Sequence, residues 1–270
     1  MEIKLPKKQS LENIRDFFYK RKLFNLLKAS HKDHETLGVD DVFKPKYYPP
    51  DLKLLYRLYQ LVQLNKRTTI VEFGSGWSTM VFASALNENK KKYFEKIKKL
   101  RRNNPFELFV LENVGKYKKI TKNKISNFVK KYNIEVKPNW IKTKARMTTF
   151  NGRLVTEYEK LPLCSPDFIY LDGPSQFSIK NKINNFSTAH KDIVPIGCDI
   201  LKIEYFLTPG TIVVVDGRAA NAKFLKDHFK RKWKCFKDPD YDQHIFYLAD
   251  PVLGRWNKLQ LDFYKSNIIK

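Results

Sequence analysis

The sequence lacks several features that would assign a protein class at once. It has no run of about 18 consecutive apolar residues, so we expect no membrane-spanning helix. Residues 1–8 have no apolar core of the signal-peptide kind. The three cysteines, Cys164, Cys198 and Cys235, are scattered and show no zinc-binding spacing. These absences favour a cytoplasmic protein with reduced thiols.

The composition is that of a folded protein. The chain has 270 residues, of which 42% are hydrophobic and 14% aromatic. This length fits one large domain, or one domain with a cap, and the apolar content allows a substantial core. Disorder of the whole chain is therefore not expected.

Acidic residues are in the minority. The chain has 52 lysines and arginines against 28 aspartates and glutamates, a net charge of +24. One interpretation is an electrostatic surface for nucleic acid, anionic lipid or an acidic substrate. The other is a lysine-rich composition without a binding role. The basic residues recur at 90–92, 96–102, 116–124 and 226–237 and form no single patch, which favours the second interpretation. Nucleic acid stays open as a partner.

The chain divides into three parts. Residues 1–50 have apolar positions at helical spacing between lysines and arginines, which predicts a helical extension that packs as a cap or lies on a membrane surface. Prolines 45, 49 and 50 end this part. Residues 51–250 are expected to form the main domain, and residues 251–270 a C-terminal tail.

From Arg67 onward, strand and helix patterns alternate. The expected strands are 68–73, 108–112, 140–143, 168–172, 211–216, 233–236 and 244–248. The expected helices are 78–86 with a charged continuation, 116–132, 199–207 and 221–229. Such alternation predicts an α/β fold with a mainly parallel sheet covered by helices on both faces. Continuous apolar strands such as 212–215 suit a sheet that is buried on both sides.

The most informative stretch is Thr-Ile-Val-Glu-Phe-Gly-Ser-Gly-Trp-Ser-Thr at residues 69–79. It reads as a strand, a tight glycine turn and the start of a helix. Glycines allow a ligand to approach the backbone closely, and the free N–H groups of a helix start favour polar or anionic groups. We therefore expect a nucleotide-like cofactor here.

The glycine spacing helps to select the cofactor. A dinucleotide fingerprint requires a third glycine, where this chain has Thr79, and an acid about 20 residues later at the end of the second strand. The acid that ends the second strand here is Glu112. This pattern disfavours an NAD-dependent oxidoreductase.

At these positions the chain resembles the class I S-adenosylmethionine-dependent methyltransferases. Residues 71–76 are similar to their first motif, and Glu112 matches their ribose-binding acid. Residues 168–174 and 208–216 resemble their fourth-strand motif and the turn with the fifth strand. The resemblance covers about residues 50–250. It implies a Rossmann-like, seven-stranded, mainly parallel sheet that closes with an antiparallel hairpin formed by the last two strands.

The resemblance also implies a set of cofactor-binding residues for S-adenosylmethionine. These are Glu72, Gly74, Ser75, Gly76, Ser78, Glu112 and Asp172. A carboxylate at a strand end can accept both ribose hydroxyls. Replacement of Gly74 by valine or of Glu112 by alanine is expected to weaken binding and to leave the fold intact. Ser78 and Thr79 also suit a purely structural role as caps of the following helix.

Candidate catalytic residues follow the fourth and fifth strands. Asp172 and Asp216 end these strands and suit a general base, a ligand for a divalent cation or a polar wall. Asp216 is followed by Gly217, which departs from the usual Asp-Asn or Asp-Asp of metal-dependent relatives and makes a metal doubtful. Arg218 offers a planar fork for a carboxylate or phosphate. His190 lies in a polar loop that could close over the site.

The expected function is methyl transfer from S-adenosylmethionine to an oxygen or nitrogen of a small-molecule or glycan-intermediate acceptor. Two alternatives stay open. One is an RNA-modifying methyltransferase that uses the basic surface, although the Asn/Asp-Pro-Pro-Tyr/Phe motif of amino methyltransferases is absent. The other is a non-catalytic binding protein with the same fold. The sequence leaves the acceptor and the oligomeric state open.

Overall fold

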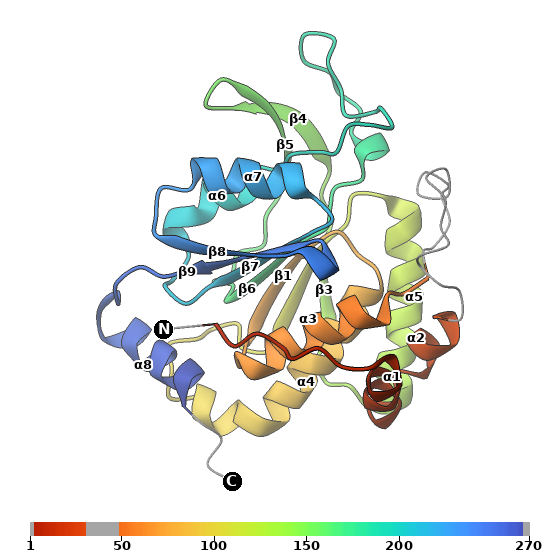
Figure 1. Ribbon diagram of the computed structural model, residues 1–270, viewed down its shortest axis with the longest axis vertical. Coiled ribbons are helices and arrows are strands. Elements are labelled where there is room, and N and C mark those ends of the chain that lie inside the picture. The colour runs from red at the N-terminus through yellow and green to blue at the C-terminus, as the bar shows by residue number, and fades with distance from the viewer. Residues whose placement is uncertain (1–2, 31–48, 267–270) are drawn as a thin grey trace.

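The computed structural model describes residues 3–30 and 49–266. Its centre is a seven-stranded sheet in the order β3-β2-β1-β6-β7-β9-β8 (Figure 1). The strands are β1 (Thr69–Phe73), β2 (Glu107–Leu111), β3 (Pro138–Ile141), β6 (Phe168–Leu171), β7 (Ile212–Asp216), β8 (Trp233–Asp238) and β9 (Gln243–Leu248). The first five are parallel to one another, and β9 runs antiparallel to both β7 and β8. The strand order and the closing hairpin confirm the predicted Rossmann-like fold.

The central strands are apolar along their whole length because both faces of the sheet are covered. All five residues of β1 are buried. Ile70 belongs to one hydrophobic cluster and its neighbour Val71 to the other, since successive side chains point to opposite faces. A parallel sheet buried on both sides requires such continuous apolar strands.

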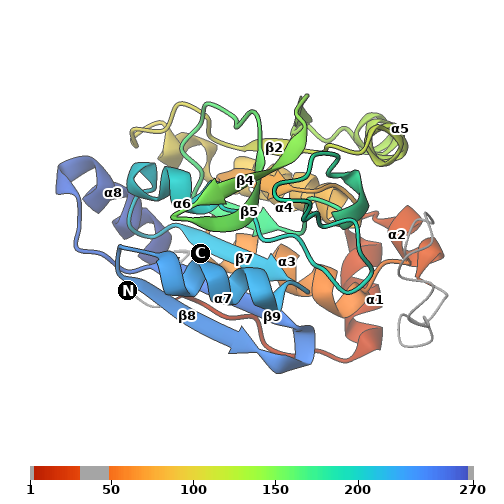
Figure 2. The ribbon, with the colours of Figure 1, turned by 90° about the horizontal axis from the view of Figure 1, so that it is seen from above.

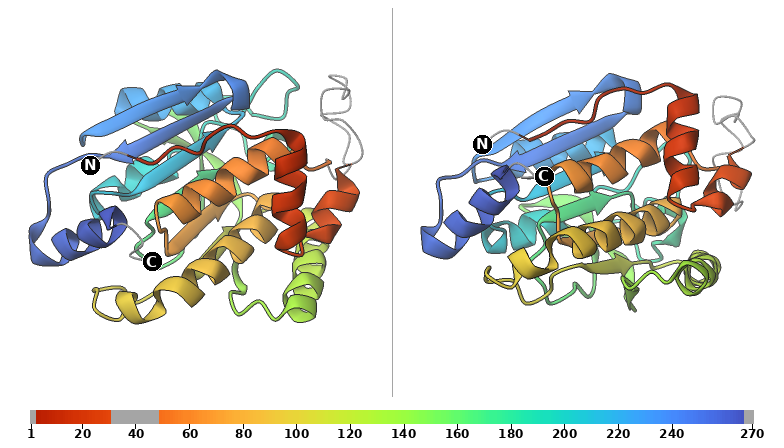
Figure 3. Two further views of the ribbon diagram at one scale, coloured as in Figure 1. Left: turned by 60° about the horizontal axis from the view of Figure 1, so that its bottom comes forward. Right: turned by 90° about the horizontal axis from the view of Figure 1, so that it is seen from below.

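Helices form a layer on each face of the sheet (Figures 1 and 3). One face carries α3 (Leu52–Leu64), α4 (Trp77–Ile97), α5 (Gly115–Tyr132) and α8 (Gly254–Lys265). The other face carries α6 (Asp199–Ile203) and α7 (Ala219–His228). Short 3-10 turns occur at Gln176–Ser178, Glu204–Phe206 and Pro239–Tyr241.

The lysine-rich run after residue 86 continues helix α4 as far as Ile97. This continuation is stabilised by residues that are buried on one side of the helix. Asn89 is fully buried and its amide donates to the carbonyls of Val62 and Arg67, while Tyr93 and Ile97 return to the core. The lysines occupy the opposite, solvated side.

A second, two-stranded sheet was not predicted from the sequence. Strands β4 (Ala145–Phe150) and β5 (Arg153–Tyr158) form an antiparallel hairpin that stands apart from the main sheet (Figure 2). Its turn is Asn151-Gly152, with both residues at positive φ. Asn-Gly is a strong signal for a two-residue hairpin, so the signal was present in the sequence.

Both ends of the described chain contain helices. Helices α1 (Leu11–Lys20) and α2 (Phe24–Ala29) precede the main domain, and α1 buries Ile14 and Phe18 in the same cluster as α3. Residues 31–48, with Pro45, lie outside the described residues, as do residues 267–270 of the expected tail. The remainder of that tail contains α8. Within the described residues, no helix is both long and apolar enough to cross a membrane.

Candidate active site

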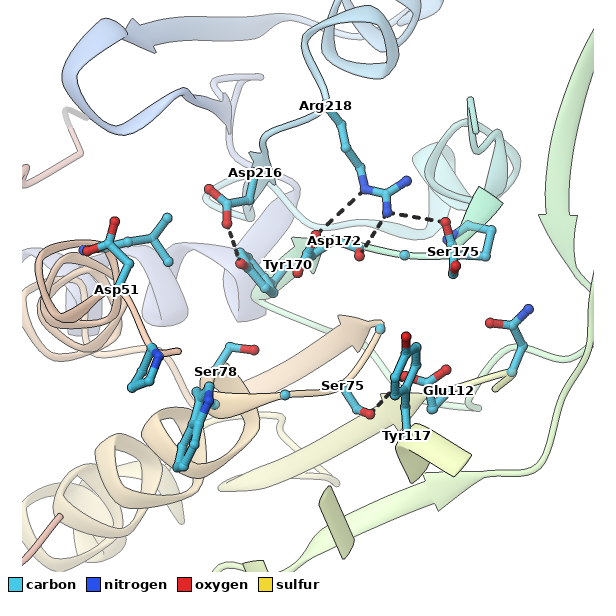
Figure 4. Close-up of a pocket in the computed structure, with 18 of the residues that line it drawn as sticks. Asp51, Ser75, Ser78, Glu112, Tyr117, Tyr170, Asp172, Ser175, Asp216 and Arg218 are labelled. Atoms are coloured by element: carbon cyan, nitrogen blue, oxygen red, sulfur yellow. Dashed lines mark hydrogen bonds and ion pairs between the residues drawn. The ribbon is translucent and has the colours of Figure 1, made fainter. Parts of the chain in front are cut away.

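A cavity of about 500 Å³ opens at the carboxyl ends of β1, β2, β6 and β7. It lies where the strand order reverses, the place where open α/β sheets bind their ligands. The glycine turn 74–76 and the start of α4 form one side (Figure 4). Residues 172–177 with Asp216 and Arg218 form another side, and the first turn of α3 contributes a further wall.

The two glycines of the turn have different physical roles. Gly74 has φ +104°, and a Cβ there would lie 3.1 Å from the carbonyl oxygen of Asp172. Gly74 therefore allows the loops after β1 and β6 to pack together. Gly76 has an extended backbone at φ −178°, and a Cβ there would meet no atom within 4 Å. Because Gly76 lines the cavity, a side chain at this position would project into free space.

The start of α4 is held by hydroxyl groups. The backbone N–H of Gly76 donates to Thr79 Oγ1 at 3.1 Å, and Ser78 Oγ donates to Glu72 Oε1 at 2.5 Å. Glu72 is fully buried and does not line the cavity. Burial raises its pKa to about 8, against the opposing hydrogen bonds from Ser78 and Thr79. Its place is therefore behind the glycine turn, whereas Ser75 and Ser78 line the cavity.

Glu112 lies just after β2 and is held by two hydrogen bonds. The backbone N–H of Val114 donates to Oε1 at 2.7 Å, and Ser75 Oγ donates to Oε2 at 2.8 Å. Burial raises the pKa of Glu112, and these two bonds oppose the rise. The structure thus brings Glu112 to the same cavity as the glycine turn, on the side where Tyr117 also lies (Figure 4).

Asp172 and Arg218 form one pair on the opposite side of the cavity (Figure 4). Arg218 Nε lies 3.8 Å from Asp172 Oδ1, and its terminal NH2 group donates to the carbonyls of Asp172 at 3.0 Å and Pro174 at 3.2 Å. The Asp172 side chain stays 54% exposed because it faces the open cavity. The pKa of Asp172 is nevertheless raised by desolvation, and Arg218 acts in the opposite direction.

Asp216 and Tyr170 form a second pair. The Tyr170 hydroxyl donates to Asp216 Oδ2 at 2.6 Å. Asp216 Oδ1 is buried and has no partner in hydrogen-bond geometry among the described residues. Burial raises the pKa of Asp216 to about 7, the charge of Asp172 adds to the rise, and Tyr170 and Gln243 oppose it. Asp216 can therefore exchange a proton near neutral pH.

Two further lining residues were not predicted as site residues. Tyr158 ends the β4–β5 hairpin, is only 4% exposed and has a hydroxyl without a partner among the described residues. Its pKa is raised well above the ordinary value by burial, so the hydroxyl stays protonated. Asp51 caps α3 by accepting from Leu54 N at 3.1 Å, and it also lines the cavity.

His190 does not belong to the cavity wall. Its side chain is 62% exposed, and its Nδ1 lies 3.7 Å from Asp192 Oδ2 and accepts from the Asp192 backbone N–H. Gln176, which lines the cavity, donates to the backbone carbonyl of His190. The loop therefore reaches the site through Gln176, and the structure gives His190 no contact there.

The acidic pair does not fit a divalent cation. Such ions take six or more oxygen ligands, or keep several waters beside carboxylates. Asp172 already faces the guanidinium of Arg218, and Asp216 accepts from Tyr170. Among the described residues, no group of three or more histidine, cysteine, aspartate or glutamate side chains could hold a metal.

Comparisons with known proteins were made at three levels. No model of a known protein family and no curated protein matches the chain. Among solved structures, the chain is similar to an SAH-bound methyltransferase of Podospora anserina, at 13% identity and a TM-score of 0.45, covering 91% of this chain and 99% of that one. It is also similar to an O-methyltransferase from Bacillus cereus in complex with SAH, at 14% identity and a TM-score of 0.38, covering 91% and 92%. A third is the O-methyltransferase TomG from Streptomyces achromogenes in complex with SAM, at 13% identity and a TM-score of 0.39, covering 90% and 100%.

The fold follows from the structure of the chain itself. Five strands are parallel, and the order in which they are added reverses at β1: β2 and β3 lie on one side of it, β6 and β7 on the other. An antiparallel hairpin with β9 inside and β8 at the edge completes the sheet. The glycine turn follows β1 and the acid Glu112 follows β2, both in the positions that the resemblance implies. The chain therefore has a Rossmann-like fold with the strand order that was expected.

Proposed function

We propose that the chain binds S-adenosylmethionine in this cavity and transfers its methyl group to an oxygen or nitrogen of a small-molecule or glycan-intermediate acceptor. The observation that supports this most strongly is the composition of one cavity. It joins the turn 74–76 and Glu112 on one side to Asp172 and Asp216 on the other. A cofactor side and an acceptor side therefore face each other.

The residues present fit the cofactor. The turn at Gly76 leaves backbone uncovered, and the N-terminus of the 21-residue helix α4 favours the carboxylate of the methionine part. Each oxygen of Glu112 is held by one hydrogen bond and keeps capacity for a ribose hydroxyl. Asn113 Oδ1, next to Glu112, is buried and without a partner among the described residues, so it can accept from the ligand.

When bound, S-adenosylmethionine supplies a methyl group on a positively charged sulfur. The chain's own task is then to align the acceptor and to receive its proton. Asp216 suits the second task because its pKa is about 7 and its Oδ2 is fixed by Tyr170 at 2.6 Å. Arg218 holds the loop of Asp172 and Pro174 in place through its two backbone contacts.

Calorimetric titration with S-adenosylhomocysteine tests the cofactor part. We expect wild-type protein to bind and Glu112→Ala to bind about 10- to 150-fold more weakly, since the loss of a hydrogen bond to a charged group costs about 1.5–3 kcal/mol. Glu107→Ala is the matched control, because Glu107 lies at the amino end of the same strand, β2, away from the cavity at its carboxyl end. Equal affinities of wild type and Glu112→Ala, or no binding by wild type, would contradict the proposal. Mass spectrometry of a methylated product tests turnover.

An RNA acceptor is the second candidate, because the net charge of +24 favours polyanions. Binding of RNA would then weaken steeply with salt as counterions are released. Filter binding at several salt concentrations separates this candidate from a small-molecule acceptor.

A further inference from the structure

The cavity differs in charge from the chain as a whole. Four carboxyl groups line it, those of Asp51, Glu112, Asp172 and Asp216. Among the described lining residues, Arg218 is the one cationic side chain. The formal charge of the lining is thus −3 in a chain of net charge +24. A solvated lysine surface explains the net charge of the chain but not the negative charge of the cavity lining.

Arg218 leaves most of this negative charge uncompensated. Its guanidinium lies beside Asp172 and donates to two backbone carbonyls. Asp216 lies on the same acceptor side, and the groups that donate to it, the Tyr170 hydroxyl and the Gln243 amide, carry no positive charge. The hydroxyl of Tyr158, a residue 96% buried, lacks a partner in the described part of the chain and lines the cavity. The carboxyl oxygens of Asp172 and Asp216 are acceptors, so this side of the cavity suits a ligand that donates hydrogen bonds, whereas the protonated Tyr158 hydroxyl can itself donate one.

Apolar and aromatic side chains also line the cavity, among them Leu54, Leu55, Tyr170 and Phe177. The Tyr170 hydroxyl contacts Asp216 directly, at 2.6 Å. Aromatic faces attract cations, and carboxylates attract them more strongly. A wall of carboxylates set among aromatic rings suits an organic cation with an apolar body.

Resting on the proposed function, we propose that the acceptor is a primary or secondary amine that binds as its ammonium form beside Asp216 and Asp172. An acceptor with a carboxylate or phosphate meets two carboxyl groups on this wall against one guanidinium, that of Arg218. A neutral alcohol gains hydrogen bonds but no charge pairing. The charge of the lining therefore selects for the amine.

The reaction at the nitrogen balances without a further reagent. The ammonium gives one proton to the carboxylate of Asp216, which leaves a lone pair on the nitrogen. This lone pair forms a bond to the methyl carbon while the carbon–sulfur bond breaks and its electron pair stays on sulfur. The products are the methylated ammonium, S-adenosylhomocysteine and a proton on Asp216 that passes to solvent.

The test uses the full chain saturated with S-adenosylhomocysteine. Calorimetry is run with matched trios in which one body carries an amine, an alcohol or a carboxylate: 2-phenylethylamine, 2-phenylethanol and phenylacetate, then hexylamine, hexanol and hexanoate. We expect each amine to bind at least tenfold more tightly than its alcohol, and the carboxylates not to bind. Equal binding of amine and alcohol, tighter binding of a carboxylate, or no binding of any amine at millimolar concentration overturns the proposal. Failure of the proposed function is distinguished by failure to bind S-adenosylhomocysteine itself.

Two variants connect the selectivity to the carboxyl group. Asp216→Asn removes the charge at nearly constant shape, so amine affinity should fall to that of the alcohol. Asp227→Asn, on the exposed face of α7 and paired with Lys223, is the control and should change neither the amine affinity nor the alcohol affinity. Retained binding of S-adenosylhomocysteine by Asp216→Asn shows that the variant is folded. Unchanged amine preference in a folded Asp216→Asn protein overturns the proposal.

Proton release gives an independent readout. The groups that influence Asp216 are Tyr170, Asp172, Gln243 and Asp242, and its pKa is about 7 in their presence. A bound ammonium lowers this pKa, so at pH 7 the carboxyl group releases part of a proton to the buffer. Titrations in buffers of different ionisation enthalpy measure this release. We expect it for wild type with amines and not for Asp216→Asn; its absence in wild type counts against the proposal.

Discussion

Substitution of Gly76 by valine should block the cavity without disturbing the fold. The backbone of Gly76 is extended at φ −178°, which any residue can adopt, and a Cβ there would meet no atom within 4 Å. The valine methyl groups would therefore occupy space in the cavity of about 500 Å³ beside the start of α4. Because Gly76 is the N-cap of α4 and glycine is preferred to valine there, stability should fall, by about 1 kcal/mol or less.

The expected loss of ligand affinity is larger. Forcing extra methyl groups into a filled site costs about 1–3 kcal/mol. At about 1.4 kcal/mol for each factor of ten, S-adenosylhomocysteine should bind roughly 5- to 150-fold more weakly.

The neighbouring glycine supplies a contrast. Gly74 has φ +104°, and a Cβ there would lie 3.1 Å from the carbonyl oxygen of Asp172. A non-glycine residue in left-handed backbone costs about 1–2 kcal/mol before any contact is counted. The expectation that Gly74→Val leaves the fold intact is therefore wrong. Even Gly74→Ala should lower the melting temperature by roughly 2–8 °C.

Thermal unfolding and calorimetry on the two single variants decide the matter. We expect Gly76→Val to bind weakly and to melt within about 4 °C of wild type, and Gly74→Ala to melt earlier still. The reasoning is refuted if Gly76→Val binds S-adenosylhomocysteine as tightly as wild type, because the cofactor would then lie elsewhere. It is also refuted if Gly74→Ala is as stable as wild type.

Three further predictions follow from the site. Burial raises the pKa of Glu72 from 4.5 to about 8, so between these pH values the folded state holds a proton that the unfolded state loses, and stability falls as pH rises. Glutamine cannot ionise, so the stability of Glu72→Gln relative to wild type, measured by denaturant titration, should grow by about 1.4 kcal/mol per pH unit from pH 4.5 to 8 and then level off. Tyr170→Phe removes a donor to the Asp216 carboxylate, so the pKa of Asp216 should rise above about 7. In a pH–rate profile, the rise of the methyl-transfer rate that accompanies deprotonation of Asp216 should therefore shift to higher pH. EDTA should leave methyl transfer unchanged, since Asp172 faces Arg218 rather than further oxygen ligands; loss of activity that Mg²⁺ restores would contradict this.

The strands were predictable because their burial leaves a local mark. Residues 212–215 are apolar at every position, and the structure buries all four on a sheet covered on both faces. The glycine turn was predictable for a similar reason: strand, turn and helix lie within residues 69–79, so the signal is contiguous. Its ends were placed within a few residues of those observed.

The β4–β5 hairpin and its contribution to the site were missed for a different reason. Asn151-Gly152 marks the turn, but its strands carry charged and apolar residues that read as an irregular segment. Tyr158 lines the cavity, and its backbone N–H donates to Asp199 Oδ1 at 2.9 Å, 41 residues later in the chain. No local pattern records a contact of that separation.

The sequence by itself determined the order of strands and helices, the glycine turn and the acid after β2, because each depends on neighbours in the chain. Only the tertiary structure decided which carboxyl groups share one cavity. It buried Glu72 behind the turn, left His190 in solvent, and set Asp51, Asp172 and Asp216 around one space. The charge of a site is a sum over side chains that meet through folding, so a chain of net charge +24 can enclose an acidic cavity.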